Sequence, residues 1–115
     1  MMTDYQWAVM QANLNPVIGT EQKGSRPVVV VSNEEYNQAV PNLTVLPLTS
    51  TKRRLYPSEV LLPSGTAGQP LDSIIMAHQI RTISKQRLGK QIGRLADIEL
   101  RSEVRDAIKE HLDIG

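Results

Sequence analysis

Hydrophobic positions follow two different spacings along this chain of 115 residues. Up to about residue 92 they come in short runs separated by proline, glycine and polar residues, a pattern typical of β-strands. From residue 96 to residue 112 they recur at helical spacing, and Leu100, Val104 and Leu112 fall on one face together with Ala107 or Ile108. The pattern predicts a mainly β chain with a C-terminal helix.

The strand-like runs differ in how deeply we expect them to be buried. Residues 27–32 are almost continuous valine, which indicates a strand buried on both faces. Ser32 and the three residues after it have the Ser-x-x-Glu form of a capping box, which predicts a short helical turn through Tyr36. The other strands are expected at residues 7–14, 43–48 (broken by Pro47), 59–62 and 73–83, with one more turn or strand at 89–92 and loops at 17–25 and 63–70.

Five or six short strands and a terminal helix indicate one domain, residues 1–115, folded as a small, strongly bent antiparallel barrel. So short a barrel leaves exposed strand edges, which proteins often cover with a helix or with a second copy of the chain. We therefore expect a homodimer.

Charge is unevenly distributed, although the formal net charge is only +1. Residues 1–51 carry a balance of −2, residues 52–94 carry +6, and residues 95–115 carry −3. A basic middle suits a polyanion-binding face, while an ordinary solvated surface is the interpretation that charge alone favours. Cysteine is absent, no signal peptide is evident, and no apolar run approaches the roughly 20 residues of a membrane helix, so we expect a cytoplasmic protein without membrane contact.

Conventional catalytic motifs do not occur in the sequence. His78 and His111 are isolated and the carboxylates do not cluster, so no metal site and no cofactor are expected. His78 is expected to be a strand residue whose ring nitrogen is satisfied. The G-x-S-x-G elbow of hydrolases and the glycine-rich phosphate loops are missing.

Arg26 and the hydroxyls that begin at Thr49 are the remaining candidates for chemistry. If strands 27–32 and 43–48 pair in antiparallel fashion, the start of one lies near the end of the other, and Arg26 and Thr49 meet at one rim. A guanidinium matches phosphate with paired hydrogen bonds, and a threonine hydroxyl can donate to the same group. From these residues alone, a structural clamp for Arg26 and a turn role for Thr49 remains the favoured alternative.

Three segments of the sequence resemble those of the MazF/PemK toxins of bacterial toxin–antitoxin systems. The segments are N-L-N-P-V-I-G-T-E-Q-K-G-S-R-P-V-V-V-V-S, V-L-P-L-T-S and H-Q-I-R-T-I-S-K-Q-R-L, and their order and spacing fit as well. The resemblance implies an SH3-like barrel, a homodimer and metal-independent, sequence-specific cleavage of single-stranded RNA, which leaves a 2′,3′-cyclic phosphate and a 5′-hydroxyl. It also implies a cognate antitoxin, for which we expect an acidic segment that folds on binding.

The resemblance also implies roles for particular residues. The catalytic arginine and threonine of the family correspond to Arg26 and Thr49, and Arg26 is expected to stabilise charge because a guanidinium keeps its proton. From its chemistry rather than from the resemblance, Tyr56 is expected either to stack on a base or to pack on the barrel. The expected substrate-binding residues are Gly19, Glu21, Gln22, Lys23, Ser50, Lys52, Arg53, Arg54, Gln79 and Arg81.

Two other functions on the same barrel compete with this hypothesis. A gyrase poison like the CcdB toxins would need a C-terminal tail that bears tryptophan, but this chain ends H-L-D-I-G and its single tryptophan is Trp7. A non-catalytic RNA-binding module would bind RNA without cutting it.

One departure from the family pattern is Trp7-Ala8, where many members have Gly-Asp, and it concerns the packing of the first strand.

Overall fold

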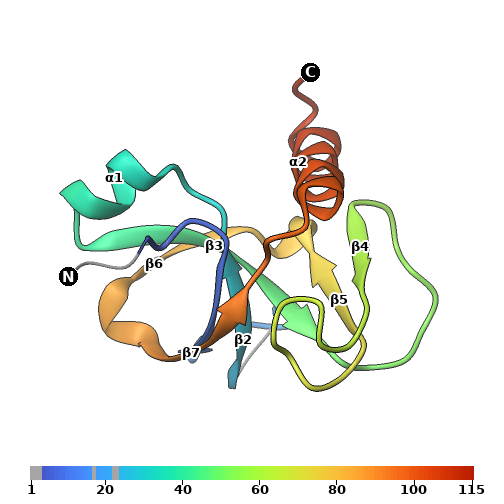
Figure 1. The fold of residues 1–115 in the computed structure, drawn as a ribbon, viewed down its shortest axis with the longest axis horizontal. Helices are drawn as coiled ribbons and strands as arrows, with labels where there is room; N and C mark the ends of the chain where they lie inside the picture. Colours follow the sequence, from blue (N-terminus) through green and yellow to red (C-terminus); the bar gives the residue numbers. More distant parts are fainter. Residues whose placement is uncertain (1–3, 17, 22–23) are drawn as a thin grey trace.

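The computed structural model describes residues 4–16, 18–21 and 24–115, which form a curved sheet with one long helix at its C-terminal end (Figure 1). The predicted class, mainly β with a C-terminal helix, is confirmed, although the described part has seven strands where five or six were expected. The elements are β1 (Ala8–Asn13), β2 (Ser25–Val30), α1 (Glu34–Ala39), β3 (Asn42–Thr49), β4 (Glu59–Leu62), β5 (Ser73–Met76), the 3-10 turn η1 (Ala77–Gln79), β6 (Arg81–Ser84), the 3-10 turn η2 (Lys85–Arg87), β7 (Leu88–Arg94) and α2 (Ile98–Leu112).

All strand pairs in the described part are antiparallel, and the sheet is barrel-like without closing. Its strand order is β4-β5-β3-β2-β1-β7, with β6 paired to β3 outside this path. The loop between β4 and β5 packs against β7, where a Cβ on Gly93 would lie 2.1 Å from the carbonyl oxygen of Ala67. Only glycine permits so close an approach of two backbones, so Gly93 lets the loop after β4, at one end of the strand order, contact β7 at the other end.

Both faces of the central strands are buried, as the valine run predicts. Val28, Val29 and Val30 are each fully inaccessible to solvent. Val29 lies in a cluster that includes Val104 of α2, whereas Val28 and Val30 lie in a second cluster that includes Ile83 of β6. The sheet is therefore rigid at β2 and β3, the strands that carry Arg26 and Thr49 at their ends.

The prediction of one continuous strand over residues 73–83 is wrong. β5 pairs with the end of β3 (Leu48 with Ile75), and β6 pairs with its beginning (Val45 with Arg81). Between these two pairs β3 spans three residues, whereas the segment from β5 to β6 spans six. This segment therefore contains three extra residues, which is the length of η1. The insertion acts like a large bulge, which pushes His78 and Gln79 out of the ladder.

Smaller differences from the sequence expectations have local causes. β3 continues through Pro47, which lies between the part of β3 that pairs with β6 and the part that pairs with β5. The helical turn is longer than expected, and Asn33 rather than Ser32 caps it, because the Asn33 side chain accepts a hydrogen bond from the Tyr36 N–H. Gly89 and its neighbours form a full strand, β7.

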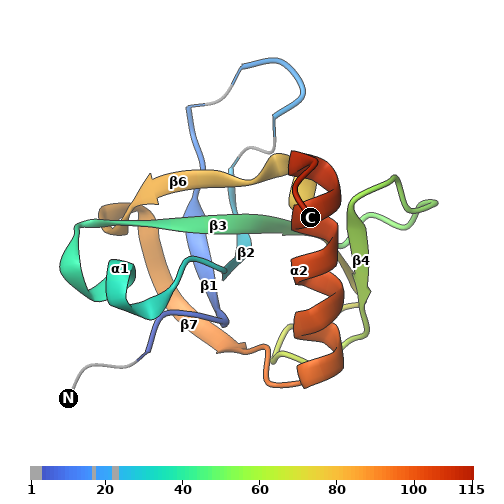
Figure 2. The ribbon, with the colours of Figure 1, turned by 90° about the horizontal axis from the view of Figure 1, so that it is seen from above.

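α2 packs across β4 and η1 (Figure 2). Asp97 caps its N-terminus, and Val104 and Ala107 are buried, as the helical spacing predicts. Leu112, on the same predicted face, is 47% exposed, since the last turn extends away from the sheet (Figure 1). No helix among the described residues is long and apolar enough to cross a membrane.

Candidate active site at the ends of β2 and β3

The pairing of β2 with β3 brings Arg26 and Thr49 into one pocket. Val28 pairs with Pro47, and the same register continued by two residues places Arg26 opposite Thr49. Both residues line a pocket of about 280 Å³, together with Ser50. The expectation that Arg26 and Thr49 meet at one rim is confirmed.

Hydrogen bonds to nearby groups hold the side chains of Arg26 and Thr49 in this pocket. Arg26 is half-buried, and its Nη1 donates a hydrogen bond to the carbonyl oxygen of Leu48 at 3.3 Å. The Thr49 side chain is 8% exposed, and its hydroxyl lies 3.1 Å from the hydroxyl of Thr51 and accepts from the Thr51 N–H at 3.3 Å. A planar donor group and a hydroxyl thus face one cavity, an arrangement suited to a tetrahedral anion such as phosphate.

Gln69 forms part of the pocket wall, and it was not among the residues predicted from the sequence. Its side chain is 1% exposed, and its Nε2 donates to the carbonyl oxygens of Leu62 at 3.2 Å, Pro63 at 2.8 Å and Leu71 at 3.4 Å. Its Oε1 accepts from the Ala67 N–H at 3.0 Å. One buried amide therefore fixes the shape of the whole loop between β4 and β5, and a turn-rich sequence gives no signal of this.

A second pocket brings Glu21 together with residues from a distant part of the sequence. Glu21, Gln79 and Arg81 line it with His78, and its volume is also about 280 Å³. The Glu21 carboxylate accepts from the Ile18 N–H at 2.7 Å, and Arg81 Nη1 donates to the carbonyl oxygen of Leu14 at 3.3 Å. The insertion at η1 is what places His78 and Gln79 here.

His78 was expected in a strand, and that part of the prediction is wrong. Its ring nitrogen is satisfied, which confirms the other part. It belongs to η1, and its Nε2 lies 2.7 Å from Glu59 Oε2. In the part of the chain that the structure describes, no three histidine, aspartate or glutamate side chains gather so that they could hold a metal ion.

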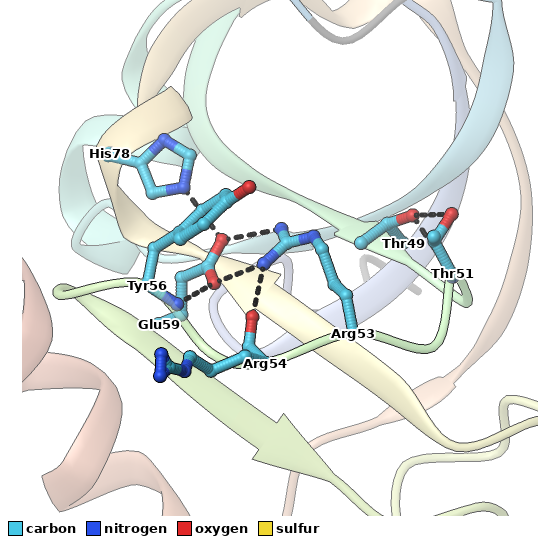
Figure 3. A network of polar contacts seen from close by, with 7 residues as sticks. All are labelled: Thr49, Thr51, Arg53, Arg54, Tyr56, Glu59 and His78. Carbon is cyan, nitrogen blue, oxygen red and sulfur yellow. Dashed lines mark hydrogen bonds and ion pairs between the residues drawn. The ribbon is translucent and has the colours of Figure 1, made fainter.

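In the basic segment after Thr49, the side chains of Arg53 and Arg54 take different directions (Figure 3). Lys52 and Arg54 are exposed. Arg53 turns inward and binds Glu59 through two contacts of 2.8 Å, Nη1 to Oε1 and Nη2 to Oε2. Glu59 was not identified from the sequence, because its partners Arg53 and His78 lie 6 and 19 residues away and only the fold brings them together.

Glu59 is the most perturbed acid of the described chain. Its side chain is fully buried, and burial alone would raise the pKa of this carboxyl. Hydrogen bonds from Arg53, His78 and the Tyr56 N–H, together with the attraction of the Arg53 charge, outweigh that effect and lower the pKa of Glu59 to about 2. Glu59 is therefore ionised at any pH near neutrality.

The remaining expected residues, Gly19, Gln22 and Lys23, belong to the segment between β1 and β2. Gly19 is exposed and adopts a positive φ of 62°. Gln22 and Lys23 lie outside the described residues.

The chain is similar to known nucleases in sequence and in structure. It is 40% identical over 111 residues to "Endoribonuclease MazF9" of Mycobacterium tuberculosis, with 92% of this chain and 93% of that protein covered. The crystal structure of MazF from Deinococcus radiodurans superposes with a TM-score of 0.81 at 27% identity, covering 95% of this chain and 96% of that one. An endoribonuclease in complex with its cognate antitoxin, from a mycobacterial species, shares the fold with a TM-score of 0.80 at 23% identity, covering 98% of both chains.

A family model agrees with these likenesses and with the resemblance found in the three sequence segments. The model describes the PemK-like, MazF-like toxin of type II toxin–antitoxin systems, and it matches residues 5–112. The chain therefore belongs to the PemK-like, MazF-like family of type II toxins.

Proposed function

We propose that this protein is the toxin of a type II toxin–antitoxin system and acts as a metal-independent, sequence-specific endoribonuclease on single-stranded RNA. The observation that carries the proposal is the meeting of Arg26 and Thr49 in one pocket at the ends of two paired strands. Family membership and the endoribonuclease relative support the reaction class.

The chemistry needs a group that stabilises charge on phosphorus. The 2′-hydroxyl attacks the adjacent phosphorus and loses its proton, while the bond to the 5′-oxygen breaks and that oxygen takes up a proton. The products are a 2′,3′-cyclic phosphate and a 5′-hydroxyl. Arg26 donates paired hydrogen bonds to the non-bridging oxygens as their charge grows, and Thr49 adds a hydroxyl donor.

The surroundings of the pocket suit a single strand of RNA. Ser50 continues the lining away from the catalytic pair, and exposed Lys52 and Arg54 follow it along the chain, where they can meet phosphates. On the other side, Glu21 and Gln79 offer hydrogen-bond groups of the kind that read base edges, and Arg81 adds a positive charge.

The proposal includes the partners and the location that the family suggests. A cognate antitoxin with an acidic segment would compete with RNA for the basic groove. A second copy of the chain would cover exposed strand edges such as β4. The protein would act in the cytoplasm, where messenger RNA is found.

The test is cleavage of a long single-stranded RNA of mixed sequence in EDTA. Wild type, Arg26→Ala and the control Lys90→Ala, which changes an exposed residue of β7 outside both pockets, are compared at equal concentration. We expect discrete cuts with cyclic phosphate and 5′-hydroxyl ends from wild type and Lys90→Ala, and none from Arg26→Ala.

Two results would contradict the proposal. Wild-type cleavage by a folded Arg26→Ala protein would refute the site. Binding without any cut, on this RNA and on a second one of unrelated sequence, would leave a non-catalytic RNA-binding module.

A further inference from the structure

Glu59 holds the segment that follows Thr49 onto the segment that carries His78. Its carboxylate has no solvent exposure, and it accepts hydrogen bonds from both Nη atoms of Arg53 at 2.8 Å, from the Tyr56 N–H at 2.6 Å and from His78 Nε2 at 2.7 Å (Figure 3). A fully buried carboxylate that accepts four hydrogen bonds from three residues is a rigid anchor.

This anchor lies between the surfaces that we assign to RNA. Arg53 lines a pocket of about 190 Å³ with Ser50, Thr51 and Lys52, next to the catalytic pair. His78 lines the pocket that holds Glu21, Gln79 and Arg81. A single carboxylate therefore contacts one wall residue of each pocket.

The contact with Glu59 also fixes the position of the Arg53 guanidinium and balances its charge. Arg53 Nη1 donates in addition to the carbonyl oxygen of Arg54 at 3.0 Å, so the guanidinium is fixed by three contacts that have normal lengths. Its central carbon lies 4.2 Å from the centre of the Tyr56 ring, and Tyr56 is 57% exposed. Arg53 thus supports an exposed aromatic face, and its charge is matched by a carboxylate.

We propose that Glu59 and Arg53 are positioning residues for RNA, which fix the 50–56 segment against η1, and that Arg53 itself makes no phosphate contact. The inference rests on the proposed function, since it assigns these residues to the same RNA surface. Of the three consecutive basic residues, only Lys52 and Arg54 then bind the phosphate backbone.

The salt dependence of RNA binding separates positioning from phosphate contact. For single strands, the slope of log K against log salt concentration becomes shallower by about 0.7 for each phosphate that the protein no longer neutralises. The probe is a single-stranded RNA that carries a 2′-O-methyl group at the mapped cut site, so that it binds but is not cut. Kd is measured over a series of salt concentrations for wild type, Arg53→Gln, Glu59→Gln, the double variant and the matched control Lys52→Gln.

We expect Arg53→Gln to raise Kd at least about fivefold with an unchanged slope, and Lys52→Gln to make the slope shallower by about 0.7. Glu59→Gln removes a negative charge, so electrostatics alone would tighten binding, but loss of the anchor should weaken it at least about fivefold. The double variant should bind RNA no more weakly than either single variant, because the two residues act as one unit. In cleavage assays KM should rise while kcat stays within about twofold.

Three results would overturn the inference. They are a slope shallower by about 0.7 in Arg53→Gln, an unchanged Kd in that variant, or tighter binding by Glu59→Gln. If Glu59→Gln does not fold, Arg53→Gln decides alone. A wild-type protein that binds no RNA would refute the proposed function together with this inference, whereas cutting by wild type with a shallower slope in Arg53→Gln would refute this inference only.

Discussion

Arg26 and Arg53 lie in adjoining parts of the molecule, yet the fold gives them opposite surroundings. Arg26 sits in the wall of an open pocket, and the acceptor described for it is a neutral carbonyl, that of Leu48. Arg53 meets a buried carboxylate, that of Glu59, through both Nη atoms. Because a buried carboxylate takes both Nη atoms of Arg53, this arginine serves the fold despite its place in a basic segment, whereas the pocket beside Arg26 leaves room for a ligand.

The largest expected effect comes from replacing each arginine by lysine. Lysine keeps the charge but loses the planar fork that matches phosphate. Arg26→Lys should lower kcat at least about a hundredfold, or about 3 kcal/mol of barrier stabilisation, whereas Arg53→Lys should change kcat less than about threefold. Single-turnover cleavage at saturating RNA measures both, and equal losses in the two variants would erase the distinction between the arginines.

The next effect is on stability in acid. The pKa of Glu59 is about 2 in the folded protein, below its ordinary value of 4.5, so its ion pair stabilises the fold fully above about pH 5 and loses that effect as the pH falls toward about 2. This lowering of the pKa corresponds to about 3 kcal/mol in the free energy of unfolding near neutral pH. Denaturant unfolding of wild type and Glu59→Gln, measured from neutral pH down to about pH 3, should give stabilities that converge in acid.

The other acid with a lowered pKa provides an internal reference. Burial would raise the pKa of Glu34, but hydrogen bonds from Gln38, Gln6, Tyr5 and Asn37 lower it. Glu34 is present in wild type and in Glu59→Gln, so its acid dependence cancels in the difference. A difference between the two proteins that stays constant with pH would contradict the role of Glu59 as a paired, buried anion.

A smaller effect is expected at Gln69, in the wall of the open pocket. Its neutral amide holds a loop in place by hydrogen bonds, as the Glu59 carboxylate does elsewhere. Gln69→Leu leaves the Ala67 N–H and the carbonyl oxygens of Leu62 and Pro63 without their partner. We expect a loss of about 2 kcal/mol in the free energy of unfolding. Gln86→Leu, on the exposed surface of η2, is the control, and equal stability of the two variants would show that Gln69 is not a structural support.

The sequence carries enough information for the central strands and for the meeting of Arg26 with Thr49, but not for their surroundings. Val28 to Val30 are buried on both faces because continuous valine has no polar side to expose, and antiparallel pairing then brings Arg26 opposite Thr49. The break at η1 could not be predicted, since residues 73–83 are apolar and β-branched enough for one strand. It arises because β5 and β6 share one edge of β3 with different registers.

Glu59 and Gln69 show the same limit for polar residues. Each is a single side chain in an unremarkable segment, and each becomes important only when distant donors or acceptors close around it. The basic segment alone indicates a substrate contact for Arg53, and it contains no sign that one of its three side chains turns inward. Local patterns predict which side chains can bind phosphate, but the tertiary contacts determine which ones are exposed to do so.

The smallest expected effect concerns Tyr56, the exposed edge of the cluster around Glu59. Tyr56 is 57% exposed and its ring rests on the Arg53 guanidinium, so a base can stack on it, and stacking of one base contributes roughly 1–3 kcal/mol to binding. Tyr56→Leu should weaken RNA binding by about 1 kcal/mol, the lower end of that range, because one face of the ring is already taken by Arg53. Tyr36→Leu, on α1, is the matched control, since Tyr36 is also exposed, at 38%, but is not among the residues described in contact with Arg53 or Glu59. If both leucine variants bound RNA as tightly as wild type, Glu59 and Arg53 would position the basic side chains only, and the aromatic face would have no part in binding.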